Sequence, residues 1–143
     1  MAYEILAAKL RELDAQLTQL SGRIHRCETA GHDDLAQEIC ALRAECEQSE
    51  LALQDRLRRS RAGIVSVLAG SYGEIERIIR ASQEELRRRA ECQSRPDAAS
   101  EEKILAAEYA LDFALQAANR ALLLSMEAID AQTAAPNTER KSS

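Results

Sequence analysis

The sequence predicts an all-α protein, specifically an antiparallel up-and-down bundle of about four long helices with coiled-coil-like packing. Ala, Leu, Glu, Arg and Gln dominate its 143 residues, and all five are good helix formers. Only 5 Gly and 2 Pro are available to end elements, and the aromatic residues are three Tyr and one Phe. Few long elements joined by short turns place consecutive helices antiparallel. A chain of this length predicts one bundle domain, over residues 1–131.

The first helix is expected over residues 3–30. Its apolar residues alternate at spacings of three and four, which is typical of the seam of a coiled coil or helical bundle. Gly31 follows in a position that suits a left-handed C-terminal cap. The seam consists of Tyr3, Leu6, Leu10, Leu13, Leu17, Leu20, Ile24 and Cys27.

The second helix is expected over residues 33–69, with Asp33 or Asp34 able to cap its N-terminus. Its seam is weaker than the first because it contains Cys46 and Ser49 among larger apolar residues.

The end of this second helix depends on three glycines. Gly70 precedes Ser71 and Glu74, whose spacing matches a capping box, so we expect the break at Gly70–Ser71 and a third helix over residues 72–93. A break near Ser60–Gly63 is the alternative.

The fourth helix is expected over residues 98–131, after a turn at Pro96, with a disordered tail over residues 132–143. Thirteen of the nineteen residues from Leu111 to Ile129 are apolar, more than one buried stripe requires. Leu123 and Met126 continue the polar edge of this helix, where charge is expected. These two residues indicate a hydrophobic docking patch, with self-association as the alternative.

The formal net charge of −5 conceals a basic middle segment. Residues 56–95 carry 10 Arg and 5 Glu, whereas acidic side chains outnumber basic ones on both sides. Spacing predicts Glu–Arg pairs four residues apart on the third helix, namely Glu76–Arg80, Glu84–Arg88 and Glu85–Arg89. The less balanced remainder is a basic patch of Arg56, Arg58, Arg59 and Arg61.

Sequence signals for catalysis are absent. There is no glycine-rich phosphate loop, no GxSxG, no HExxH and no ExxH, so we expect no enzyme activity and no cofactor. His25, Cys27 and His32 straddle a helix end and do not have the spacing of a metal site. Four cysteines without a CxxC motif indicate reduced thiols and a cytoplasmic protein. Charges interrupt the apolar fourth helix, which argues against a membrane span.

The order of these features resembles one family. The segments "AGHDDLAQEICALRAECEQSELAL" and "LQAANRALLLSMEAIDA" are similar to the small bacterial flagellar type III export chaperones for hook–filament junction proteins. The resemblance implies a helical hairpin followed by an amphipathic C-terminal helix that embraces the exported client. It also implies a client surface formed by Leu115, Leu122, Leu123, Met126 and Ile129.

Together, these observations predict a non-catalytic adaptor or chaperone that presents its last helix to another protein. Two alternatives remain. One is a nucleic-acid-binding protein that uses the basic patch, which the acidic ends and the Glu–Arg pairs disfavour. The other is a structural homodimer without another ligand, with which the sustained leucine seam of the first helix is compatible.

Overall fold

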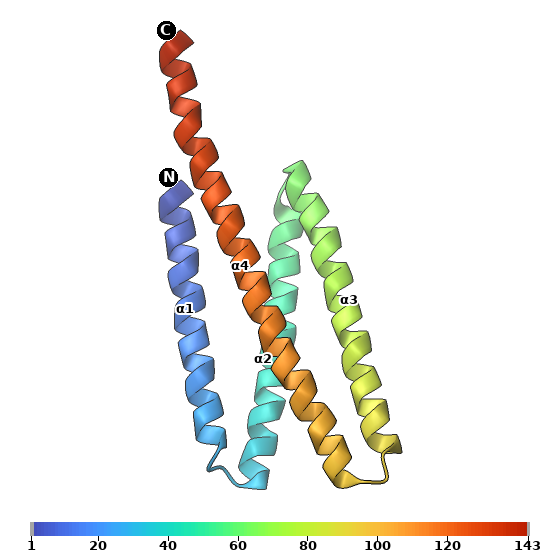
Figure 1. Cartoon of the computed structure of the whole chain (residues 1–143). Coiled ribbons are helices and arrows are strands. Elements are labelled where there is room, and N and C mark those ends of the chain that lie inside the picture. Colours follow the sequence, from blue (N-terminus) through green and yellow to red (C-terminus); the bar gives the residue numbers. More distant parts are fainter. Residues whose placement is uncertain (1, 143) are drawn as a thin grey trace. The chain divides into compact units, whose positions relative to one another are not determined.

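The computed structural model describes the backbone of residues 2–142 and the side chains of residues 3–134. This part of the chain is all-α, as predicted: it contains four helices and no strand. The helices are α1 (Ala2–Cys27), α2 (His32–Arg59), α3 (Gly63–Cys92) and α4 (Pro96–Ser142). Short segments of three or four residues connect them, and Figure 1 shows their order along the chain.

The chain divides into two units. The hairpin unit is Ala30–Ile104 and contains α2, α3 and the start of α4. The terminal unit combines Met1–Thr29 with Leu105–Ser143, and so contains α1 and the remainder of α4. The closing of all four helices into one bundle domain over residues 1–131 stays a prediction.

The expected break at Gly70–Ser71 is wrong, and the alternative near Ser60–Gly63 is confirmed. The α2 helix ends at Arg59, and Ser60 adopts an extended conformation. The Ser60 hydroxyl accepts a hydrogen bond from the Ala62 backbone N–H (3.3 Å), which stabilises the turn in place of further helix. Gly70 therefore lies inside α3.

The cap expected at Gly31 is also wrong. The α1 helix ends at Cys27, and a tight turn follows in which the backbone N–H groups of Glu28 and Thr29 bond to carbonyls three residues earlier. Gly31 is consequently too far from α1 to cap it. It is instead the N-cap residue of α2, with an ordinary extended φ of −69°.

The fourth helix begins close to the expected position. Pro96 is the first residue of α4, where its missing N–H costs no helical hydrogen bond. The expected end of the fourth helix at residue 131 is wrong: the backbone of residues 132–142, expected as a disordered tail, continues α4 to Ser142.

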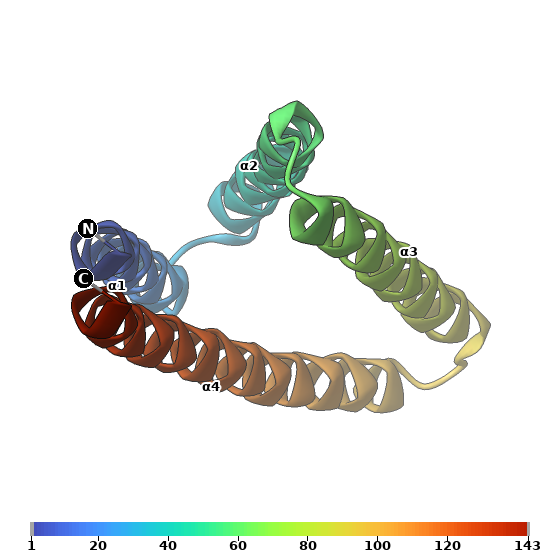
Figure 2. The same ribbon diagram turned by 90° about the horizontal axis from the view of Figure 1, so that it is seen from above.

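Within the hairpin unit, α2 and α3 are antiparallel and contact each other beside their turn. They separate with distance from that turn in both Figure 1 and Figure 2. Half-buried residues on one side of each helix mark the contact. They are Glu50, Gln54 and Leu57 of α2, and Val65, Leu68, Glu76 and Ile79 of α3.

No side chain among residues 3–134 is fully buried. Cys46, expected on the seam of the second helix, is exposed. In the α1 seam, Leu6, Leu20 and Cys27 are half-buried, whereas Leu13, Leu17 and Ile24 are exposed. The seams predicted from sequence are therefore largely uncovered within each unit.

Candidate protein-binding surfaces

The C-terminal part of α4 carries a continuous apolar face. Leu115, Leu122 and Ile129 are seven residues apart, so they lie on one side of the helix, and Met126 lies one turn from Leu122. The exposed fractions are 63% for Leu115, 40% for Leu122 and 57% for Met126, while Ile129 is half-buried. We call these four residues the α4 face.

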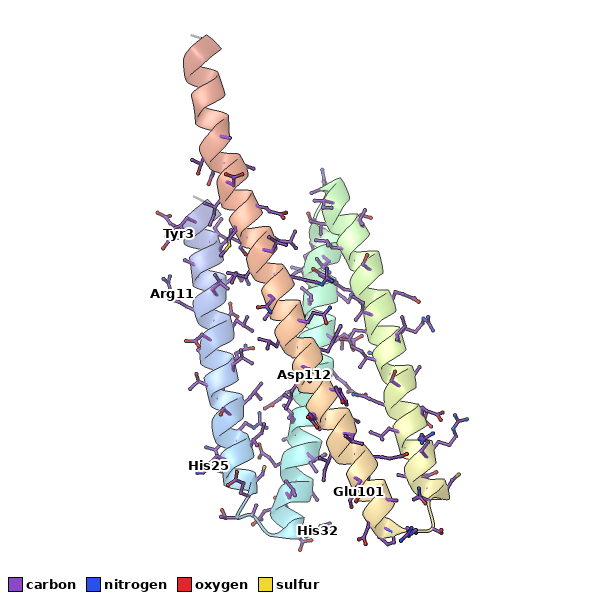
Figure 3. All side chains as sticks on the ribbon, in the orientation of Figure 1. Tyr3, Arg11, His25, His32, Glu101 and Asp112 are labelled. Carbon is purple, nitrogen blue, oxygen red and sulfur yellow. The ribbon has the colours of Figure 1, made fainter. Side chains whose placement is uncertain are left out.

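Leu123 differs from the other predicted partner-binding residues. It follows Leu122 directly, so it lies about 100° further round the helix. Its side chain is 56% exposed. It extends the flank of the α4 face on the side of Asp112, the polar residue labelled in Figure 3. All five predicted residues therefore belong to one region, with Leu123 at its edge.

Leu111 enlarges this surface. It lies one turn before Leu115 on the same side of α4, and its side chain is 66% exposed. The spacing in the sequence predicts a stripe that faces the other helices of a bundle, formed by Ile104, Leu111, Leu115, Ala118, Leu122 and Ile129. Within the terminal unit that stripe is open at Leu111, Leu115 and Leu122, so the spacing identified the face but not its exposure.

The basic patch lies at the turn between α2 and α3. Every residue from Arg58 to Ile64 is exposed. Arg59 pairs with Asp55 one turn earlier, at 2.9 Å between Nη2 and Oδ2. Arg56, Arg58 and Arg61 form no ion pair or hydrogen bond with any other described side chain. The patch is thus a local excess of positive charge.

The arginines of α3 are compensated, but by other partners than those expected. The pairs along the helix are three residues apart: Arg77 with Glu74, Arg87 with Glu84, and Arg88 with Glu85. Arg87 also pairs with Glu91.

The hydrogen bonds from Arg77 and Arg87 hold the pKa of Glu74 and of Glu84 below the ordinary value. These acidic side chains therefore remain charged partners of the arginines near neutral pH.

Arg80 and Arg89 were expected to pair along α3 and instead reach other helices. Arg80 bonds to Glu50 of α2, and Arg89 bonds to Glu102 of α4. Both arginines lie where α3 faces another helix. The glutamate of that helix therefore binds each arginine in place of the glutamate four residues earlier in α3. Arg56, Arg58 and Arg61 of the basic patch remain, with Arg43 and Arg95, the arginines of the hairpin unit that pair with no described acidic side chain.

Histidine and cysteine residues do not converge on a site. Among the described residues, no three His, Cys, Asp or Glu side chains could together hold a metal ion. His25 and His32, labelled in Figure 3, lie at the end of α1 and the start of α2. The Nδ1 atom of His25 lies 3.7 Å from Oε2 of Glu28. Cys27 is half-buried, and Cys40 and Cys92 are exposed.

Comparison of the chain with protein-family models, with curated proteins and with solved structures finds no match. None of the helices in the described part is both long and apolar enough to cross a membrane. The α4 face and the basic patch are therefore the two features that bear on function.

Proposed function

We propose that this chain is a non-catalytic helical adaptor or chaperone that binds a partner protein through the α4 face. The observation that carries the proposal is the exposure of Leu115, Leu122 and Met126 along one side of a single helix. Covering one such side chain is favourable by about 1.5–3 kcal/mol, so a helix presenting several of them gains affinity for any groove that matches.

The chemistry of the face favours a partner helix or strand over a small ligand. The residues lie on a convex helix surface, and recognition of an amphipathic helix uses anchors at this spacing. Met126 has an unbranched, polarisable side chain that adapts to differently shaped partners, as a chaperone for several states of a client requires.

The narrower proposal is an export chaperone located in the cytoplasm. It rests on the resemblance of the two quoted segments to flagellar export chaperones, and the α4 face then serves as the client surface. The rival assignment is a homodimer in which the same face binds a second copy.

A photo-crosslinking residue placed at Leu115, Leu122 or Met126 tests the proposal in the native host. We expect all three positions to yield the same adduct with a different polypeptide. Arg120, an exposed residue two positions before Leu122 and therefore on the other side of α4, is the control and should yield little. Adducts confined to a second copy of this chain would establish the homodimer, and adducts confined to its own α2 or α3 would contradict both assignments.

A further inference from the structure

A second surface, at the turn of the hairpin unit, is independent of the α4 face. We define the hairpin tip as residues 56–67, which comprise the end of α2, the turn and the start of α3. From residue 56 to residue 73 the sequence contains four Arg and no Asp or Glu. We propose that the hairpin tip docks on a bilayer surface that carries anionic lipid headgroups.

The arginines surround the tip. Arg56 and Arg59 are three residues apart and share one side of α2, whereas Arg58 is rotated by at least about 100° from both. Arg61 lies beyond the helix, in the turn itself. Positive charge therefore faces outward on several sides, and guanidinium groups bind phosphate oxygens in a fork geometry.

Two aliphatic side chains accompany this charge. Ile64 is 65% exposed and Val67 is 62% exposed in the first turns of α3. Their neighbours Val65 and Leu68 are half-buried against α2. The tip thus combines a basic rim with a small apolar surface, which is the composition that binds at the boundary between headgroups and acyl chains.

Stabilisation of the C-terminal end of α2 by positive charge explains only some of the residues at the hairpin tip. Basic residues in the last turn interact favourably with the negative end of the helix dipole, and the effect is confined to that turn. Arg56, Arg58 and Arg59 meet this description. Arg61 lies outside α2, and the aliphatic side chains of Ile64 and Val67 do not interact with the helix dipole.

Nucleic acid is the less suitable anionic partner. Non-specific binding of single strands uses aromatic side chains on which bases stack. The tip contains none. The nearest aromatic residue, Tyr72, lies on the side of α3 that carries Val65 and Ile79 towards α2. A bilayer accommodates the arginines and the aliphatic pair at once.

Vesicle sedimentation tests the proposal on the full chain. Vesicles of phosphatidylcholine with about 30% phosphatidylglycerol supply the anionic surface, and pure phosphatidylcholine supplies the neutral one. We expect binding to the first only, with loss of binding between about 0.05 M and about 0.5 M salt. Because the whole chain carries a net charge of −5, binding to an anionic surface requires a local basic site.

Two double variants distinguish a contribution of the hairpin tip to vesicle binding from a general effect of the net charge of the chain. Arg58→Gln with Arg61→Gln should weaken partitioning roughly 25-fold, since one basic residue near such a surface contributes about fivefold. Arg77→Gln with Arg87→Gln removes the same charge from paired positions of α3 and should change partitioning by less than about threefold. Circular dichroism of each variant verifies that its helix content equals that of the wild type.

The contribution of the two aliphatic side chains to vesicle binding is tested with a variant at the hairpin tip and a control variant outside it. Ile64→Ser with Val67→Ser should weaken binding to anionic vesicles, whereas Leu51→Ser, at a 67% exposed position of α2 outside the tip, should not.

Several results would overturn the proposal. One is equal binding of the wild type to neutral and anionic vesicles, and another is equal loss in the two arginine variants. The absence of vesicle binding together with tip-dependent binding to an oligonucleotide would assign the arginines to nucleic acid instead.

Discussion

The guanidinium group of Arg89 holds both carboxylate oxygens of Glu102. The distances are 3.2 Å from Nε to Oε2 and 2.6 Å from Nη2 to Oε1. This bidentate pair joins the end of α3 to the second turn of α4 across the short connection between them. Parallel hydrogen bonds of this kind fix orientation as well as distance. The pair therefore orients the start of the helix that carries the α4 face.

The Arg89–Glu102 pair makes stability depend on pH. The hydrogen bond from Arg89 holds the pKa of Glu102 below its ordinary value of 4.5. A carboxyl whose pKa is lower in the folded state contributes stability that is present above the unfolded pKa. That contribution is lost as the pH falls through the folded pKa. We expect Glu102→Gln to be less stable than the wild type at neutral pH, and this difference to shrink as the pH is lowered towards about 3.

Urea unfolding of both proteins across this pH range measures the effect. Glu101→Gln is the matched control, since Glu101 is the adjacent exposed carboxylate and forms no ion pair with another described residue. A constant difference between wild type and Glu102→Gln down to pH 3 would exclude the carboxylate's charge as its cause.

The continuity of α3 through its glycines gives a second prediction. Gly70 and Gly73 lie inside the helix, and a Cβ at either position meets nothing within 4 Å. Replacement of each by Ala should raise the free energy of unfolding by about 0.5–1 kcal/mol, because alanine loses less backbone entropy on entering a helix.

Thermal or urea unfolding measures this gain, with Gly31→Ala as the control. Gly31 lies at an N-cap in an extended conformation that alanine also adopts, so no gain in helix propensity is available there. Destabilisation by Gly70→Ala would instead indicate the helix break that the sequence alone favours.

The Glu50–Arg80 pair should contribute modestly to the hairpin unit. Glu50 is partly covered, with 22% of its side chain exposed, whereas the Arg80 side chain is 61% exposed. A double-mutant cycle with Glu50→Gln and Arg80→Gln should give a coupling free energy of about 0.5–1 kcal/mol, near the upper end for exposed ion pairs. A cycle on Glu74 and Arg77, which lie on one helix, should give less. Zero coupling for Glu50 and Arg80 would show that the pair does not hold α2 to α3.

The sequence predicted the helices well because helical periodicity is a local signal. The seam of α1 and the apolar spacing of α4 specify helices whatever surrounds them. The α2–α3 turn was misplaced because the sequence offers two candidate turns, one near Ser60 and one at Gly70–Ser71. The second has the spacing of a capping box, whereas the hydrogen bond of the Ser60 hydroxyl leaves no comparable sequence pattern. Gly31 was misassigned because a tight turn at Glu28 ends α1 earlier than the apolar pattern does.

Tertiary partners were less accessible from sequence. Arg80 and Arg89 have acids at suitable spacing along α3, and nothing local indicates that Glu50 and Glu102 compete for them. The exposure of Leu115 and Leu122 was equally hidden, because the same spacing suits a buried stripe and an open one. The basic patch was predictable, since Asp55, which pairs with Arg59, is the one acidic residue within four positions of these arginines in the sequence.

The most direct test of the central claim is equilibrium urea unfolding of Leu122→Glu with Met126→Glu at two protein concentrations. If the α4 face is a docking surface, the free energy of unfolding should change by no more than about 0.5 kcal/mol per site and should not depend on concentration. A loss of about 4 kcal/mol or more would mean that the face is a structural core. A wild-type stability that rises with concentration, and that the variant lacks, would mean that the partner is a second copy of the chain.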